Sequence, residues 1–330
     1  MQNFKHILVY AGTEQPETAV TRATELALEN KARLTLMDVV KPLPKSLGLN
    51  RALGMMAKVA KPDDLEKRFA ADRRRKLLDI AADFSDTAVP LDVVVAIGDP
   101  ATEITRQVVN GDHDLVVKTA DGFSAGGRLF GSVAKSLLRL CPCPVWLLKP
   151  EIHGEFDQVL AAIDVESEDK THTDLNRQIL ELAYSIAQRD SAQLHVVAAW
   201  QLWMEDSIRG HAGDDAVDSI RKDHEAKVHR ALDELLQAPF ADAHDIRVHL
   251  RHGSAALVIR SIADEVEADL LVMGTVCRTG VAGLLIGNTA ESVIPDATCS
   301  LLALKPDGFV SPVEMSSVIL TEQDEPLPLL

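Results

Sequence analysis

The chain has 330 residues, of which 46% are hydrophobic and 25% are charged. One domain usually takes about 100–200 residues, so the length favours two domains, each large enough to bury its own core. The formal net charge of −16 is unevenly shared, because residues 1–150 carry +3 and residues 151–330 carry −19. An acidic half repels polyanions, so the composition speaks against nucleic acid or an anionic membrane surface as a partner.

Cysteine use and hydropathy predict a reducing compartment. The four cysteines include Cys141 and Cys143, which are separated by one proline, a spacing unsuited to a bond between them. The apolar run within MQNFKHILVYAG is too short for a signal peptide, and no apolar stretch approaches the roughly 18 residues of a membrane-spanning helix. We therefore expect a cytoplasmic protein with no membrane span.

Two long segments of the chain are copies of one unit. The sequence GSVAKSLLRLCPCPVWLLKP at 131–150 aligns with GNTAESVIPDATCSLLALKP at 287–306, with an offset of 156 residues. IGDPATEITRQVV at 97–109 aligns with HGSAALVIRSIAD at 252–264, with an offset of 155. So steady an offset indicates duplication of a unit of about 150 residues. We expect two domains and a tail, over residues 1–151, 155–307 and 308–330.

Short apolar runs, several of them rich in β-branched residues, predict five strands in each unit. In the first unit these runs lie at 6–11, 33–39, 91–97, 114–118 and 144–148. In the second unit they lie at 158–163, 193–199, 246–251, 269–273 and 300–304. Amphipathic helical segments alternate with them, a pattern typical of parallel sheets with right-handed crossovers. The predicted fold is α/β: two tandem, doubly wound, five-stranded parallel-sheet domains with αβα layers.

Two long connections follow the second strand of each unit, at 40–62 and 200–216. Both mix apolar residues with glycine, proline or charges. One interpretation is a helix-plus-loop insertion that covers a sheet edge or a domain interface. The other is a lid over an apolar ligand, for which Met55, Met56 and Trp203 would supply contacts.

A strand, a glycine-rich loop and a helix follow one another in LLVMGTVCRTGVAGLLIGNTAESV, residues 270–293. Glycines let a backbone approach a ligand closely, and a helix N-terminus offers unpaired N–H groups with partial positive charge. Asn288 and Thr289 could cap the helix or donate to phosphate, and Arg278 could add a cation. No lysine follows the last glycine, so this is not the GxxxxGK[ST] loop. The pattern favours a phosphate site, although such loops also serve purely structural turns.

These residues resemble the nucleotide-binding signature of the universal stress proteins, in which Gly, two residues, Gly, nine residues and Gly precede Ser or Thr. Here the signature falls on Gly274, Cys277, Gly287 and Asn288. The resemblance extends over nearly the whole chain and implies a family fold in both units. It also implies that an aspartate ending the first strand, here Asp164, contacts the nucleoside, and that backbone near Val197 meets the adenine. The implied nucleotide site comprises Asp164, Val165, Val197, Met273, Gly274, Cys277, Arg278, Gly287, Asn288 and Thr289.

The second unit departs from the signature at Cys277, which adds a side chain where glycine is usual, and at Asn288, whose amide can still donate to phosphate. A thiol near a helix N-terminus could also act as a redox sensor, the alternative being an inert thiol. The first unit departs further. It has Lys118 and Asp121 at the first two glycine positions and Ala11 at the aspartate position. We expect no ATP there, and a Lys118–Asp121 ion pair instead.

The resemblance implies a stress-response protein that binds ATP or another adenine nucleotide in its second domain, with Mg²⁺ as an optional companion. No catalytic residue stands out, so any ATP hydrolysis would be slow. We expect an internal pseudo-dimer of the two units, and a homodimer stays open. The alternative is a nucleotide-free binding or scaffold protein for a protein partner or an apolar, lipid-like ligand. An SGG[KIM]D loop of the ATP pyrophosphatases is not present at AGTEQ or DVESE.

Overall fold

The computed structural model describes residues 4–43, 62–84, 87–121, 130–150, 154–167, 169–240, 246–275 and 286–313. These residues form two compact units. Residues 3–124 with 130–150 belong to what we call the first unit, and residues 151–309 form the second unit. The finer domain boundaries and the expected pairing of the two units stay predictions.

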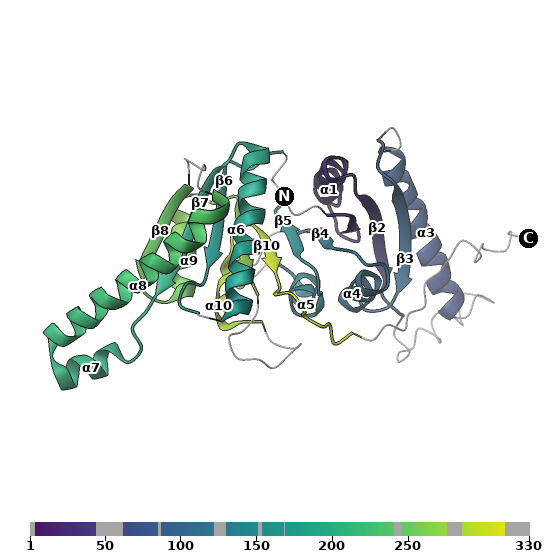
Figure 1. Ribbon diagram of the computed structural model, residues 1–330. Coiled ribbons are helices and arrows are strands. Elements are labelled where there is room, and N and C mark those ends of the chain that lie inside the picture. Colours follow the sequence, from purple (N-terminus) through teal and green to yellow (C-terminus); the bar gives the residue numbers. More distant parts are fainter. Residues whose placement is uncertain are drawn as a thin grey trace, which may run out of the picture. The chain divides into compact units, whose positions relative to one another are not determined.

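The first unit is a five-stranded parallel sheet in the order β3-β2-β1-β4-β5 (Figure 1). Its strands are β1 (His6–Tyr10), β2 (Arg33–Val40), β3 (Leu91–Ile97), β4 (Leu115–Thr119) and β5 (Val145–Leu148). Its helices are α1 (Glu17–Asn30), α3 (Pro62–Ala82), α4 (Pro100–Asn110) and α5 (Ser132–Leu140). Because parallel crossovers are right-handed, α1 and α3 lie on one face and α4 and α5 on the other.

The second unit repeats this sheet in the order β10-β9-β6-β7-β8. Its strands are β6 (Gln158–Ile163), β7 (Gln193–Trp200), β8 (Ile246–His252), β9 (Leu270–Gly274) and β10 (Ser300–Leu304). Its helices are α6 (Lys170–Asp190), α7 (Glu205–Ala212), α8 (Asp214–Phe240), α9 (Ala255–Glu265), α10 (Asn288–Val293) and the 3₁₀ helix η1 (Ile294–Asp296). In both units the strand order reverses beside the first strand, which makes the fold doubly wound.

The predicted fold class is confirmed, and all ten predicted strands lie within one residue of the observed bounds. The central strands are buried on both faces: Ile7, Leu8 and Val9 of β1 are each 0% exposed. Such strands need continuous apolar sequence, which is why the runs could be found without help from alternation.

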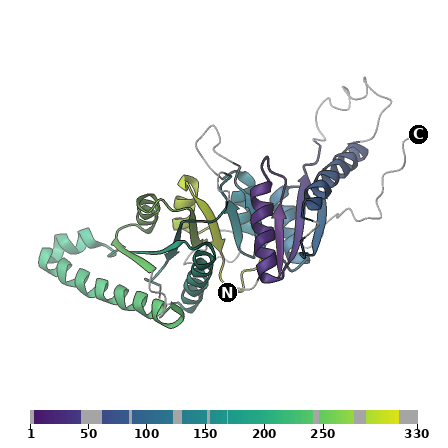
Figure 2. The same cartoon turned by 90° about the horizontal axis from the view of Figure 1, so that it is seen from above.

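The connection at 200–216 forms α7 and the start of α8, whereas most of 40–62, including Met55 and Met56, lies outside the described residues. No residue of α7 is buried, and Trp203 is 84% exposed. Figure 2 shows α7 lying beside the N-terminal part of α8, away from the strands. In the part of this connection that the structure describes, the Trp203 side chain therefore faces solvent and covers no ligand cavity.

The described cysteines and helices bear on two further features of the chain. Cys141 Sγ and Cys143 Sγ lie 3.5 Å apart, well beyond the length of about 2.05 Å of a disulfide bond. Within the described ranges, no helix combines the length and apolar character that a membrane crossing requires.

Candidate functional site

A cavity of about 450 Å³ lies in the second unit where the strand order reverses, between β6 and its neighbours. Doubly wound sheets bind ligands at this place, beyond the carboxyl ends of the strands. The ends of β6, β7 and β9, the turn before α9, the start of α10 and one side of α6 all contribute to its wall. The topology therefore brings several segments between residues 162 and 290 together around this cavity.

Asp164 stands at the end of β6, and two neighbours fix its position. The amide of Asn176 on α6 clamps the backbone of Asp164, since its Oδ1 accepts from the Asp164 N–H at 3.0 Å and its Nδ2 donates to the carbonyl at 2.6 Å. The carboxylate Oδ1 of Asp164 accepts from the backbone N–H of Glu166 at 3.1 Å. A carboxylate oriented in this way at a cavity wall can accept from a ligand hydroxyl or amine.

Glu166 connects the cavity with α8. Its Oε1 accepts from the backbone N–H of Gln201 at 3.1 Å and lies 3.2 Å from His224 Nε2. The ring of Trp200 lies between His224 and His252, with ring centroids 5.5 and 4.6 Å away. Glu166 also lines a smaller cavity, of about 330 Å³, between α6 and α8. Among the described residues, no three His, Cys, Asp or Glu side chains converge as metal ligands do.

The glycines of this site serve packing as well as access. A Cβ at Gly274 would lie 2.8 Å from Leu175 Cδ2, so the glycine makes room for α6 against the end of β9. Gly287 is the N-cap of α10, and its N–H donates to the carbonyl of Thr275 at 3.0 Å. Gly253 has φ +140°, a conformation that side chains rarely adopt, and sits in the turn from β8 to α9.

The N-terminus of α9 is a feature that the sequence reasoning missed. Ser254 is its N-cap and makes no side-chain capping bond, and both Ser254 and Ala255 line the cavity. The first turn carries no acidic residue. Its backbone N–H groups and partial positive charge are suited to an anionic ligand group. The signal in the sequence is a glycine and a serine between a predicted strand and an apolar helical segment.

Six of the ten predicted site residues line this cavity: Asp164, Met273, Gly274, Gly287, Asn288 and Thr289. Val165 lines the smaller cavity instead. Val197 is fully buried within the sheet, where it pairs with Ala162, while Ala199 and Gln201 form the cavity wall on this side. Cys277 and Arg278 lie outside the described residues.

The corresponding place in the first unit is occupied by the protein's own charges. The side chain of Lys118 is fully buried, and its Nζ donates to Asp121 Oδ1 at 2.7 Å and to the carbonyl of Thr119 at 2.8 Å. The expected Lys118–Asp121 pair is thereby confirmed. Asp121 Oδ2 accepts from the backbone N–H of Gly131 at 3.1 Å, so a carboxylate already occupies the start of α5.

A tyrosine side chain also occupies space at this place in the first unit. Tyr10, at the end of β1, is 5% exposed, and its hydroxyl would lie 2.4 Å from a Cβ placed on Gly12. Burial raises the pKa of Tyr10 above its usual value, and the carboxylates of Asp38 and Asp121 raise it further. Asp38 is also buried, and Arg73 lies 3.3 Å from it.

The comparisons with known proteins bear on both units. The sequence profile of the Universal stress protein family matches residues 3–149 and 155–305. Universal stress protein E of Escherichia coli (strain K12) is 32% identical over 240 residues, which cover 70% of this chain and 73% of the relative. Universal stress protein E of Photorhabdus laumondii is 26% identical over 329 residues, or 95% of this chain and 99% of the relative.

Solved structures share the fold over almost the full length. A functionally unknown protein from Pseudomonas aeruginosa PAO1 superposes with a TM-score of 0.68 at 25% identity, over 93% of this chain and 94% of that one. A universal stress protein from Archaeoglobus fulgidus gives a TM-score of 0.61 at 19% identity, over 92% of this chain and 99% of that one. The second likeness speaks for the fold alone.

Proposed function

The chain belongs to the universal stress protein family, as a tandem stress-response protein, and on this premise we propose that its second unit binds ATP or another adenine nucleotide. The observation that carries the proposal is the cavity at the strand reversal, which gathers Asp164, Gly274, Gly287, Asn288 and Thr289. Its volume of about 450 Å³ lies within the range of about 300–1,000 Å³ that is usual for small-molecule sites.

The wall suits the three parts of a nucleotide. Leu175, Ile179 and Met273 provide an apolar surface for a base. Asp164 can accept from ribose hydroxyls or from a base amine. The N-terminus of α9 at Ser254 offers backbone N–H groups to phosphate oxygens.

The carboxylates of Asp164 and Glu166 on the same wall would repel phosphate groups. Mg²⁺, when bound with the nucleotide, would neutralise part of the phosphate charge, and Arg278 is a second source of positive charge. We assign no general base, so the proposed role is regulatory, with at most slow hydrolysis in which the chain positions the nucleotide. Three described cysteines are free thiols, which supports a place in the reducing cytoplasm.

Isothermal titration of the full chain with ATP and with Mg²⁺–ATP tests the proposal. We expect saturable binding for wild type, at least tenfold weaker binding for Asp164→Ala, and none for Gly287→Arg, whose side chain would enter the cavity. Asp218→Ala on the exposed surface of α8 is the matched control and should bind as wild type does. Wild type that shows no heat with either ligand, and that copurifies with no nucleotide, would contradict the proposal.

A second candidate function has one observation in its favour. Trp203 is 84% exposed and Met204 49% exposed at the start of α7, and such residues are enriched in protein interfaces. A nucleotide-free binding protein would use this surface to bind a protein partner. In a variant of this function, the protein would bind an apolar small molecule instead. Failure of the ATP titration, together with partner binding that Trp203→Ser abolishes, would favour this function over the first.

A further inference from the structure

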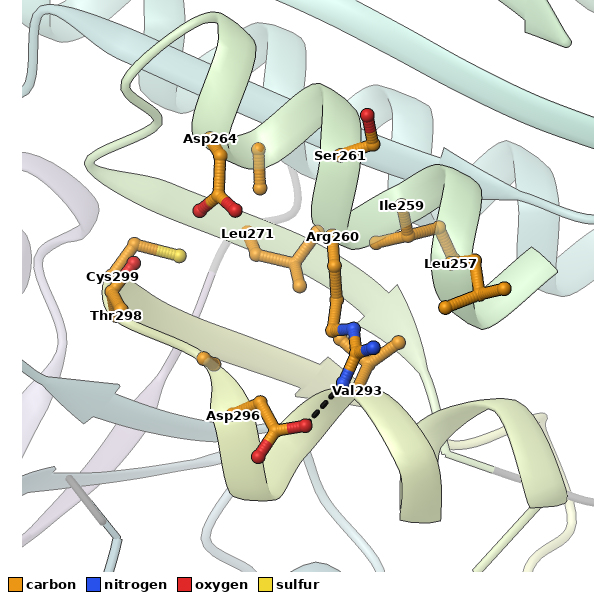
Figure 3. A pocket seen from close by; sticks show the side chains of 12 residues that line it. Leu257, Ile259, Arg260, Ser261, Asp264, Leu271, Val293, Asp296, Thr298 and Cys299 are labelled. Carbon is orange, nitrogen blue, oxygen red and sulfur yellow. Dashed lines mark hydrogen bonds and ion pairs between the residues drawn. The ribbon is translucent and has the colours of Figure 1, made fainter. Parts of the chain in front are cut away.

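A second cavity, of about 410 Å³, lies between α9 and the segment that runs from α10 through η1 to β10 (Figure 3). It runs along α9 from Leu257 to Asp264, whereas the proposed nucleotide cavity is at the N-terminal end of that helix. Cys299, which directly precedes β10, marks its other end. The two cavities share one lining residue, Ile259.

The aligned helices of the first unit differ from those that line this cavity. There α5 runs for nine residues and packs on α4, and Thr105, Leu137 and Cys141 are all fully buried. In the second unit α10 has six residues and gives way to η1, which contains a proline. α10 and η1 together span nine residues, as α5 does, so the segment keeps its length and differs from α5 in its proline and in the 3₁₀ geometry of its last turn.

Substitutions at equivalent positions make the hollow polar at its rim. Arg260 stands where the first unit has Thr105, and it forms an ion pair with Asp296 across the cavity. Asp264 stands where the first unit has Val109. Asp296 stands where the first unit has Leu140. Three charged side chains around the cavity thus replace uncharged residues of the first unit.

The inner wall stays apolar. Leu271 and Val293 are each 1% exposed, and Ile259 is 6% exposed. Leu257 extends the apolar wall outward and is 60% exposed, which is unusual for a residue of its size. An apolar wall with a few charged groups at the rim is typical of small-molecule sites.

The charges favour a cation over an anion. Arg260 is already paired with Asp296, and no cation among the described residues pairs with Asp264. In Figure 3 the carboxylate of Asp264 points toward the side of the cavity occupied by Cys299. Asp264 lies in the last turn of α9, where the helix dipole contributes further negative potential. The second half of the chain carries −19, which adds a long-range attraction for cations.

We propose that this cavity binds a small protonated amine with an apolar body. The ammonium group would form an ion pair with Asp264, and the apolar body would contact Ile259, Leu271 and Val293. An organic anion would have to displace Asp296 from Arg260 and would face the carboxylate of Asp264, so the site discriminates by charge.

Titration of the nucleotide-free full chain with 2-phenylethylammonium, followed by the methyl NMR signals of Ile259, Leu271 and Val293, tests this site. The neutral 2-phenylethanol and the anionic phenylacetate have similar shapes and serve as charge controls. We expect saturable shifts with the ammonium, binding about tenfold weaker for the alcohol, and no saturation with phenylacetate.

Asp264→Asn should weaken ammonium binding about tenfold and leave alcohol binding unchanged, whereas Asp233→Asn on α8 should change neither. Ala297→Met should fill the cavity and abolish binding of both probes, with thermal unfolding as the check that each variant is folded. Equal binding of ammonium and alcohol, an unaffected Asp264→Asn variant, or no saturable shift with any probe would overturn the proposal. Shifts confined to methyl groups of the other cavity, such as those of Ala162 and Met273, would overturn it too.

Discussion

The two units share one fold and differ most where the fold can bind a ligand. In the first unit, the Asp121 carboxylate accepts a hydrogen bond from the N–H of Gly131, and the fully buried Lys118 neutralises the charge of this carboxylate. In the second unit, the same end of the sheet keeps a cavity of about 450 Å³. The first unit therefore fills this place with an internal ion pair, whereas the second unit has a cavity there.

The two units also differ in how the helix before the third strand packs on the sheet. In the first unit, α3 packs on β2 and β3, and Val95 of β3 is 3% exposed. In the second unit, α8 contacts α6 and α7 and makes no comparable contact with β8. Val248 of β8, which aligns with half-buried Val93, is 44% exposed. The second unit is thus more open than the first at the site and at the β8 edge of its sheet.

Acid should destabilise the first unit through His113. This side chain is 4% exposed, stacks on His6 at 3.7 Å and bonds to Thr35 Oγ1 at 3.0 Å. Burial first and the neighbouring His6 second lower the pKa of His113 to about 4. The unfolded chain, with a pKa of about 6.5, then binds more protons, so stability is complete above pH 6.5 and falls as the pH drops toward 4.

We expect a loss of about 3 kcal/mol in the free energy of unfolding by pH 4. Urea denaturation at a series of pH values measures it, and His113→Gln should flatten the profile while exposed His211→Gln should not. The second unit should respond in the same direction, because burial first and the neighbouring His249 second lower the pKa of His195 to about 4. An equal pH dependence for wild type and His113→Gln would contradict this origin.

Removing the Asp121 carboxylate from the first unit should have the next largest effect on the free energy of unfolding. Asp121→Ala leaves the ammonium of Lys118 buried without its carboxylate, and we expect a loss of about 2 kcal/mol, a moderate value because Asp121 is 43% exposed. The double variant Lys118→Met with Asp121→Ala should recover most of it. Asp72→Ala, which breaks the exposed pair with Arg75, should cost under about 0.5 kcal/mol. If the double variant proves no more stable than Asp121→Ala in urea denaturation, the pair does not act in this way.

The sequence sufficed for the fold because ten apolar runs and one steady repeat define ten strands and their order. It was less sufficient for the site. Gly274 lines the cavity, and its missing Cβ also makes room for Leu175, a contact visible only in three dimensions. On β7 the cavity wall is formed by Ala199, two residues beyond Val197, because the sequence does not show where a strand leaves the sheet. The exposed edge at β8 has a signal in the sequence: the apolar residues of IRVHLRH alternate with arginine or histidine, whereas LDVVVAI of β3 shows no such alternation.

The turn into α9 provides a sharper test of how the second site is built. Gly253→Ala forces a Cβ into φ +140°, and we expect a loss of about 1–3 kcal/mol in stability, together with weaker ATP binding, because Ser254 would move. Gly210→Ala is the matched control: nothing lies within 4 Å of the added Cβ, and an alanine in helix α7 should stabilise by up to about 1 kcal/mol. Thermal unfolding and ATP titration of both variants decide it, and an unchanged Gly253→Ala would mean that the turn tolerates a side chain.

The smallest expected effect concerns the exposed start of α7. Trp203→Ser should change the free energy of unfolding by less than about 0.5 kcal/mol, because the side chain is 84% exposed and α7 buries no residue. Trp200→Ser should cost several times more, because Trp200 is 3% exposed and contacts the rings of His224 and His252. Urea denaturation separates the two tryptophans. A large loss for Trp203→Ser would mean that this segment packs on the unit in solution, and the contrast between the open second unit and the closed first unit would then be smaller than the structure indicates.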